Sequence, residues 1–222
     1  IEHPRGLGWG LLPPEHRPDP VPRQLKGMLR EAAAWWNPDP KRVSALVNHM
    51  VEKDVIWDPT LYIWVLSSSL EGLIPESEYE GLPEWIKADM AEGSKHGFKS
   101  TWIKSDYEAY GAGIPSMRKM VGEFYSKGGL VTAGSDGGIP GVSLHRELEQ
   151  LLLSGLAPVD CLRAATLNGA LSLQKESEIG SLEKGKAADI VFIQGNPLQD
   201  IKALKDVFMT VQEGQIVYKK EN

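Results

Sequence analysis

Hydrophobic residues recur at helical spacing in several stretches of the chain. The clearest begins at Asp39, which suits a helix N-cap, and Pro40, which suits the first helical position. The apolar residues that follow recur at intervals of three and four, as on one helix face: Val43, Leu46, Val47, Met50 and Val51. The same spacing predicts helices over 23–36, from 117 to the glycines at 128–129, and over 158–173. It also predicts a helix capped by Ser143 and ended by Gly155, with one apolar face formed by Leu144, Leu148, Leu151 and Leu152.

Shorter apolar segments between these helices predict strands. Residues 54–60 form an apolar run stopped by proline, residues 130–133 form one bounded by glycines, and residues 1–3 look like the end of another. A strand, a helix and a second strand in that order are typical of right-handed crossover units with parallel strands. The pattern therefore predicts an α/β fold for residues 1–175.

The last part of the chain, residues 176–222, has a different pattern. Two apolar stretches, 207–212 and 215–218, flank Glu213 and Gly214, and this arrangement is a hairpin signal. The sequence predicts a small β segment here.

Residues 61–114 are the least patterned part and carry scattered Trp and Tyr residues. Long insertions after strand ends often form lids or substrate walls, so aromatic residues such as Trp64 are candidates to line a pocket for an apolar or aromatic group. The alternative is that these aromatic residues form a hydrophobic cluster beneath the insertion.

Composition narrows the choice of partners. Hydrophobic residues make up 41% of the 222 residues and charged residues 24%, as in globular proteins. The formal net charge of -6 offers no electrostatic basis for binding nucleic acid or an anionic membrane. The single cysteine, Cys161, lies in a helical pattern and excludes an intrachain disulfide. With no signal-peptide pattern and no long apolar run, we expect a cytoplasmic protein with a small-molecule or dipeptide-like substrate.

Two polar residues stand where predicted strands end. Asp136 follows the strand at 130–133 in a glycine-rich turn, and His3 follows the strand stub at the start of the chain. Active sites of parallel α/β folds lie at the carboxyl ends of strands. From the residues alone, Asp136 is either a site carboxylate or a turn residue that accepts local N–H groups, and His3 is either a site residue or a structural one.

Taken together, these segments resemble the C-terminal half of the metal-dependent amidohydrolase superfamily, most closely its imidazolonepropionase-like and Xaa-Pro dipeptidase-like branch. The strongest resemblance lies in AATLNGA at 164–170 and IGSLEKGKAADIV at 179–191. Three segments resemble the ends of barrel strands: IEH at 1–3 the sixth, the Pro-Thr that ends 55–60 the seventh, and GSD at 134–136 the eighth. GVSLHREL at 141–148 resembles the start of the following helix.

The resemblance implies part of a (β/α)8 TIM barrel, strands six to eight with their helices, plus part of a small β-sandwich at 176–222. It also implies one or two divalent metal ions, zinc being the expected metal. Asp136 then binds metal and takes the proton of the attacking water, whose pKa a divalent metal lowers to about 7. His3 is then a metal ligand or a contact to the substrate carbonyl, and His145, Thr60 and Trp64 are candidate substrate contacts.

Other ligands of the family, including the paired histidines after its first strand, have no counterpart here and should precede residue 1. Of the remaining histidines, His16, His49 and His96 are expected to be structural or exposed. We therefore expect an incomplete barrel that pairs with an N-terminal half or forms a homo-oligomer. The leading hypothesis is a metal-dependent hydrolase of C–N bonds, with hydrolysis and deamination both open. The alternatives are a non-catalytic chain that acts through oligomerisation or pairing and, with less support, a flavodoxin-like binding domain.

Overall fold

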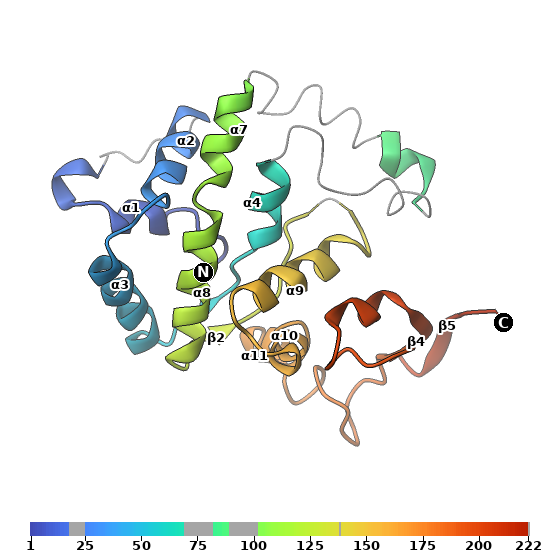
Figure 1. The fold of residues 1–222 in the computed structure, drawn as a ribbon. Helices are drawn as coiled ribbons and strands as arrows, with labels where there is room; N and C mark the ends of the chain where they lie inside the picture. Colours follow the sequence, from blue (N-terminus) through green and yellow to red (C-terminus); the bar gives the residue numbers. More distant parts are fainter. Residues whose placement is uncertain (18–24, 69–81, 89–101, 138, 222) are drawn as a thin grey trace.

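The computed structural model describes residues 1–17, 25–68, 82–88, 102–137 and 139–221. A mainly helical body is followed by a three-stranded sheet at the C-terminal end (Figure 1). The longer elements of the body are α2 (Leu25–Ala34), α3 (Pro40–Glu52), α4 (Leu61–Ser67), α7 (Lys104–Gly111), α8 (Ile114–Ser126), α9 (Ser143–Leu153), α10 (Pro158–Ala164) and α11 (Leu167–Ser172). Shorter helical turns are α1 (Leu7–Leu11), η1 (Pro14–His16) and η2 (Ile201–Lys205). Within the described ranges, every helix is too short or too polar to span a bilayer.

The parallel strands predicted from the sequence are present but short. Strand β1 (Ile56–Trp57) pairs in parallel with β2 (Leu130–Val131), and a parallel bridge joins Glu2 to Asp58. The mixed α/β class is therefore confirmed. In the described part of the chain these three segments remain open and do not close into a barrel. The strand expected over 54–60 is shorter because Asp54 has a left-handed φ of 50° and Pro59 has no N–H to donate.

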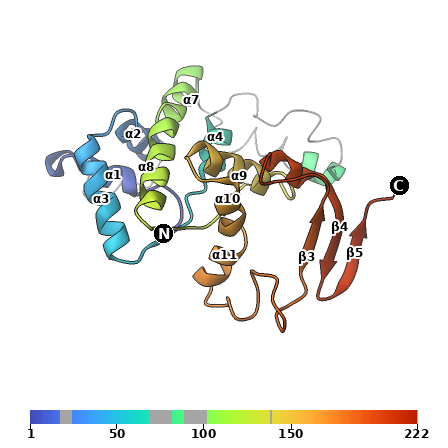
Figure 2. The same cartoon turned by 60° about the horizontal axis from the view of Figure 1, so that its bottom comes forward.

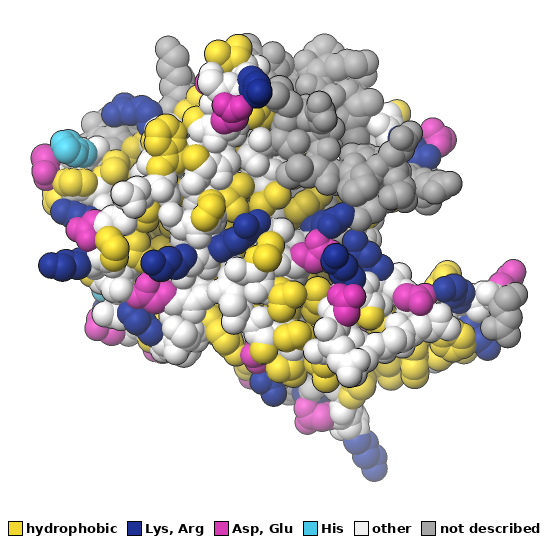
Figure 3. Space-filling model, viewed as in Figure 1, with side chains coloured by type: hydrophobic (Ala, Val, Ile, Leu, Met, Phe, Trp, Pro, Cys, Tyr) yellow, Lys and Arg dark blue, Asp and Glu magenta, His cyan; other side chains and the backbone are white. Residues whose placement is uncertain are grey.

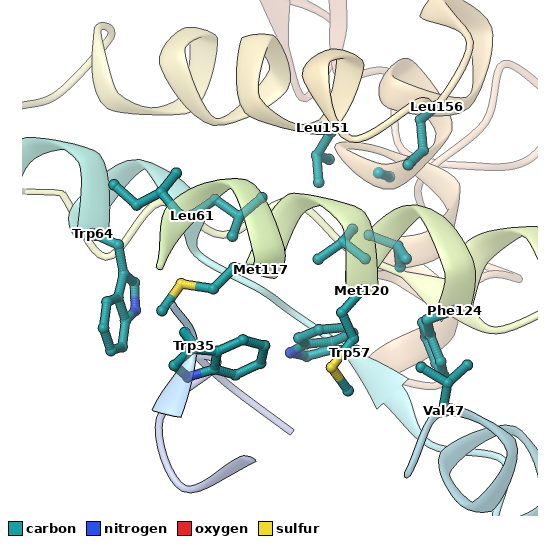
Figure 4. Close-up of a cluster of buried hydrophobic side chains, with 14 of the residues drawn as sticks. Trp35, Val47, Trp57, Leu61, Trp64, Met117, Met120, Phe124, Leu151 and Leu156 are labelled. Atoms are coloured by element: carbon teal, nitrogen blue, oxygen red, sulfur yellow. The ribbon is translucent and has the colours of Figure 1, made fainter. Parts of the chain in front are cut away.

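Helix α8 lies at the centre of the main hydrophobic cluster (Figure 4). Met117, Met120 and Phe124 are fully buried on one of its faces, next to Trp35 and Trp57. Phe124 meets Trp57 edge to face, with ring centroids 5.6 Å apart. Helix α9 covers the opposite side with Leu151. The helix-period pattern thus identified this core correctly.

The sequence also predicted α3 accurately. The Asp39 side chain accepts a hydrogen bond from the Lys41 N–H, and Pro40 is the first helical residue. Val43, Val47 and Met50 are buried, as the spacing required. The 23–36 pattern corresponds to α2, which ends at Ala34, two residues before the expected end; residues 23–24 lie outside the described ranges.

The aromatic residues of 61–114 divide into buried and exposed groups. Trp64 stacks on Tyr110 with ring centroids 4.7 Å apart, and Trp102 lies 5.2 Å from Tyr110. All three are buried in the main cluster, so the packing interpretation is confirmed for them. Trp85 is 71% exposed, and Tyr79 lies outside the described residues.

Two predictions about the later helices were wrong in detail. Ser143 is the first residue of α9 rather than its cap, and its hydroxyl accepts the N–H of Ile139. Leu144 and Leu152 are exposed, whereas Leu148, Leu151 and the acidic residue Glu147 are buried. The helix predicted over 158–173 is broken between α10 and α11, because Thr166 has a non-helical conformation (φ -131°, ψ -92°).

The C-terminal sheet has the order β3 (Ile190–Ile193), β4 (Val207–Gln212), β5 (Gln215–Lys219), with antiparallel pairs throughout (Figure 2). The predicted hairpin is confirmed: Glu213 and Gly214 have φ values of 49° and 77°, as a two-residue turn of this kind requires. The division at residue 175 into barrel and sandwich segments stays a prediction.

Candidate active site

The carboxyl ends of the three parallel segments meet at one edge, because parallel strands run in the same direction. His3 follows the bridged Glu2, Asp58 follows β1, and Asp136 lies in the loop that follows β2. The backbone joins the first two directly: the N–H of His3 donates to the Asp58 carbonyl at 2.9 Å. The structure therefore brings together His3 and Asp136, which are 133 positions apart in the chain.

The His3 imidazole lies between Thr60 and Asp136. Its Nδ1 is 2.6 Å from the Thr60 hydroxyl oxygen, within hydrogen-bond distance. Its Nε2 is 3.9 Å from Oδ2 of Asp136, which is too far for a hydrogen bond. The side chains of His3 and Asp136 are 32% and 58% exposed, so both are accessible from solvent. Thr60 itself is buried.

Three residues at this edge adopt left-handed backbone conformations. The φ angles are 66° at His3, 44° at Thr60 and 43° at Asp136. Such conformations cost of order 1–3 kcal/mol for a non-glycine residue, and they are most unusual for a β-branched residue such as Thr60. Strain of this kind, held in place by the surrounding structure, gathers at active sites and ligand clamps.

Asp58 links the loops that carry the other two residues. Its Oδ1 accepts the Gly134 N–H at 2.7 Å. Burial raises the pKa of the Asp58 carboxyl; the Gly134 N–H lowers it, Glu2 raises it, and the nearby His3 lowers it. A Cβ added at Gly134 would collide with the Asp58 carboxylate, so only glycine allows the two segments to approach this closely.

A third carboxyl group, that of Glu147 on α9, lies at the start of α4. It is fully buried and accepts the backbone N–H groups of Leu61 at 3.0 Å and Tyr62 at 2.6 Å. These N–H groups open α4 and have no partner within the helix, so Glu147 satisfies them. Burial raises the pKa of Glu147 to about 8, although the two N–H groups act in the opposite direction.

The pair formed by His3 and Asp136 suits a divalent metal ion. An imidazole nitrogen and a carboxylate oxygen are common zinc ligands, and two bonds of about 2.1 Å at the tetrahedral angle place the two ligand atoms about 3.4 Å apart. The observed separation is 3.9 Å, so a shift of about 0.5 Å would let both atoms bind one ion. Among the residues that the structure describes, no group of three or more His, Cys, Asp or Glu side chains gathers to hold an ion. His3 and Asp136 would therefore supply two of the ligands of a metal ion, and the remaining ligands would come from elsewhere.

The remaining predicted site residues have different surroundings. Thr60 contacts His3, as described above. His145 lies in the first turn of α9 and is half-buried, and Trp64 is buried in the main cluster. Substrate contacts by these three residues stay predictions. His16 and His49 are exposed, as expected, and His96 lies outside the described ranges.

The sequence interpretation missed the roles of Asp58 and Glu147. A signal for Asp58 was available, because it is an acidic residue at the end of an apolar strand, which was the argument used for Asp136. Glu147 gave no comparable signal, because a glutamate in an amphipathic helix is ordinarily exposed.

Comparison with known proteins identifies the family of the chain. The model of the Amidohydrolase family matches residues 83–217, more than half of the chain, and the matched range includes Asp136 and Glu147. The chain belongs to the amidohydrolase family. The resemblance inferred from the sequence motifs is thereby confirmed.

Individual relatives are similar to parts of the chain. Ochratoxinase from Aspergillus niger is 31% identical over 160 residues, which is 71% of this chain and 27% of that protein. A 5-methylthioadenosine/S-adenosylhomocysteine deaminase from Symbiobacterium thermophilum is 32% identical over 129 residues, 47% of this chain and 30% of that protein. The amidohydrolase chain thus spans less than a third of either relative.

Solved structures show the same fold. A Xaa-Pro dipeptidase with bound methionine superposes with a TM-score of 0.56 at 20% identity, covering 88% of this chain and 43% of the other. The Aspergillus niger ochratoxinase structure gives a TM-score of 0.55 at 20% identity, covering 88% and 40%.

Proposed function

We propose that this chain forms part of a metal-dependent hydrolase of C–N bonds and provides the site edge that holds His3 and Asp136. The observation that carries the proposal is the pairing of His3 Nε2 with Asp136 Oδ2 at 3.9 Å, next to the ends of parallel strands, in a chain of the amidohydrolase family. The substrate class is an amide, a cyclic amide or a peptide-like bond.

Each residue has a role that its surroundings support. His3 would hold the metal or polarise the substrate carbonyl through Nε2, while its Nδ1 stays bonded to Thr60. Asp136, more than half exposed, would hold the metal and accept the proton of the attacking water. A bound divalent ion, for which zinc is our choice, lowers the pKa of a coordinated water so that this proton can leave near neutral pH.

We further propose that the chain corresponds to strands six to eight of a TIM barrel and pairs with an N-terminal half that supplies the other ligands. The three parallel segments and their open arrangement support this. The partial coverage of relatives and of solved structures is consistent with it. Ochratoxinases, deaminases and dipeptidases occur among the similar proteins, so the choice between hydrolysis and deamination requires an assay.

The test is amine and ammonia release from a panel of N-acyl amino acids, Xaa-Pro dipeptides and aminopurines. The chain is assayed with zinc, alone and mixed with a separately made N-terminal half. We expect turnover by the wild type and by the Asp54→Asn variant. A chelator should abolish this turnover, and the Asp136→Asn variant should have none. Asp54 is a matched control because it is exposed and also has a left-handed φ, 50°. Turnover that persists in Asp136→Asn would contradict the proposal.

A second candidate is a non-catalytic chain that acts only by oligomerisation or pairing. It is favoured by exposed apolar side chains on the C-terminal sheet, at Val191, Phe192, Ile216, Val217 and Tyr218. Zinc-dependent turnover by this chain, alone or paired, would eliminate this candidate. Assembly without turnover on any substrate, in a complex that binds no zinc, would support it.

A further inference from the structure

Asp58 contacts the segments of both His3 and Asp136. Its backbone carbonyl accepts the His3 N–H at 2.9 Å, and its own N–H donates to the Ile1 carbonyl at 2.9 Å. Its side chain accepts the Gly134 N–H at 2.7 Å, two residues before Asp136. The backbone of Asp58 therefore holds the segment of His3, and its carboxylate holds the loop of Asp136.

The backbone N–H groups that lead to Asp136 bond to different segments of the chain. Thr132, the first residue after β2, donates its N–H to the Trp57 carbonyl, and Ala133 donates its own to the Ala164 carbonyl. Beyond these two residues, the Gly134 N–H is turned toward Asp58, and Asp136 itself is in a left-handed conformation. The bond from Gly134 to Asp58 thus lies between the regular strand and the strained residue, where it can fix the direction in which the loop leaves the sheet.

The contact is also sterically selective. A Cβ at Gly134 would overlap the Asp58 carboxylate, and φ at Gly134 is not in the left-handed region. The lack of a side chain at 134 is therefore explained by the approach of Asp58 and not by backbone conformation.

From this geometry we infer that Asp58 is a positioning residue of the amidohydrolase site: it sets the separation of His3 and Asp136 by holding Gly134, and it does not bind the metal itself. This inference rests on the proposed function. A carboxylate that supports a metal ligand typically changes metal affinity 10- to 100-fold when it is removed.

Zinc titration of three variants tests the inference. Each variant is titrated in the state in which the wild type binds zinc, either alone or mixed with an N-terminal half. Asp58→Ala removes the acceptor and should weaken zinc binding at least tenfold. Asp58→Asn keeps an oxygen for the Gly134 N–H and should stay within about threefold of the wild type, because conservative replacement preserves the hydrogen bond. Gly134→Ala keeps the carboxylate but displaces the loop, and it should also lose about tenfold.

The matched control is Asp189→Ala, directly before β3. Asp189 accepts the Glu213 N–H at 2.7 Å, so this variant removes the same kind of bond away from the site edge. It should leave zinc affinity unchanged. A second readout, the proton chemical shift of the Gly134 amide without metal, should move upfield in Asp58→Asn, because a bond to a neutral oxygen is weaker than one to a carboxylate.

The outcomes separate the two proposals. If the wild type binds no zinc in any pairing state, the proposed function fails. If it binds zinc and Asp58→Asn loses as much affinity as Asp58→Ala, Asp58 acts as a ligand and the positioning role is overturned. Wild-type affinity in Asp58→Ala or in Gly134→Ala also overturns it. If Asp58→Ala does not fold, Asp58→Asn and Gly134→Ala still decide.

Discussion

At the scale of single residues, the site edge depends on side chains that hold one another in unfavourable backbone conformations. Thr60 illustrates this: its hydroxyl bonds His3 while its own φ is 44°. Sequence could place Asp136 and His3 at strand ends, because that inference needs only the apolar pattern. It could not reveal the bond between His3 and Thr60, since nothing local links positions 57 residues apart.

Thr60→Val removes this hydroxyl and keeps the shape of the side chain. We expect at least a tenfold loss of zinc affinity, because the His3 ring loses the contact that orients it, with a cost of about 1 kcal/mol in unfolding free energy. Thr60→Ser keeps the hydroxyl and should restore the affinity. Isothermal titration with zinc makes the comparison, and equal affinities in Val and Ser variants would refute the orienting role.

The buried carboxyl of Glu147 predicts how stability depends on pH. Because its pKa is raised to about 8 in the folded chain from an ordinary 4.5, the folded state holds a proton that the unfolded state has lost between these values. Unfolding free energy from this group must then fall as pH rises from about 5 to 8, by up to about 4 kcal/mol.

Urea unfolding of the wild type and Glu147→Gln at several pH values measures this effect. The difference in slope between the two proteins over pH 5–8 isolates the contribution of Glu147. Identical slopes would show that the carboxyl has an ordinary pKa in the folded chain.

At the scale of elements, helical periodicity was a good guide wherever a helix has one buried face. It located α3 and α8 and their core residues, including Val47 and Met120. On α9 it was right for Leu148 and Leu151 but wrong for Leu144 and Leu152, which are exposed while Glu147 is buried. The reason is tertiary: α9 must satisfy the start of α4, and periodicity contains no information about that partner.

The close packing of α8 against the end of α9 gives a test at this scale. A Cβ at Gly122 of α8 would strike the backbone carbonyl of Ser154. Gly122→Ala should therefore destabilise the chain by about 1–3 kcal/mol, as overpacking does. Gly169→Ala in α11 meets nothing within 4 Å and should instead stabilise it by about 0.5–1 kcal/mol. Thermal unfolding compares the two, and a stabilised Gly122→Ala would show that the helices are not in contact there.

At the scale of the whole molecule, the C-terminal sheet exposes apolar side chains. Adjacent residues of a strand face opposite sides of a sheet, and the exposed pairs Val191 with Phe192 and Ile216 with Val217 therefore leave apolar side chains on both sides. Figure 3 shows hydrophobic side chains along the C-terminal sheet. The sequence predicted the hairpin from its turn residues, but a turn signal does not say what covers the sheet.

Such a surface should drive association. We expect the 24.4 kDa chain to sediment as an oligomer, or as a complex with an N-terminal half. The double variant Ile216→Lys with Tyr218→Lys should weaken assembly. Glu176→Lys, an exposed position with the same change of two charges, should not. Sedimentation equilibrium decides, and a monomeric wild type that also fails to pair would refute the expectation.

The central claim is that His3 and Asp136 form part of a metal site. The most direct measurement is the zinc content of the purified chain, in its assembled state, after incubation with zinc and removal of the excess. We predict stoichiometric zinc in the wild type and in the Asp54→Asn control, and loss of that zinc in Asp136→Asn. A wild type that retains no zinc, or an Asp136→Asn variant that retains as much as the wild type, would contradict it.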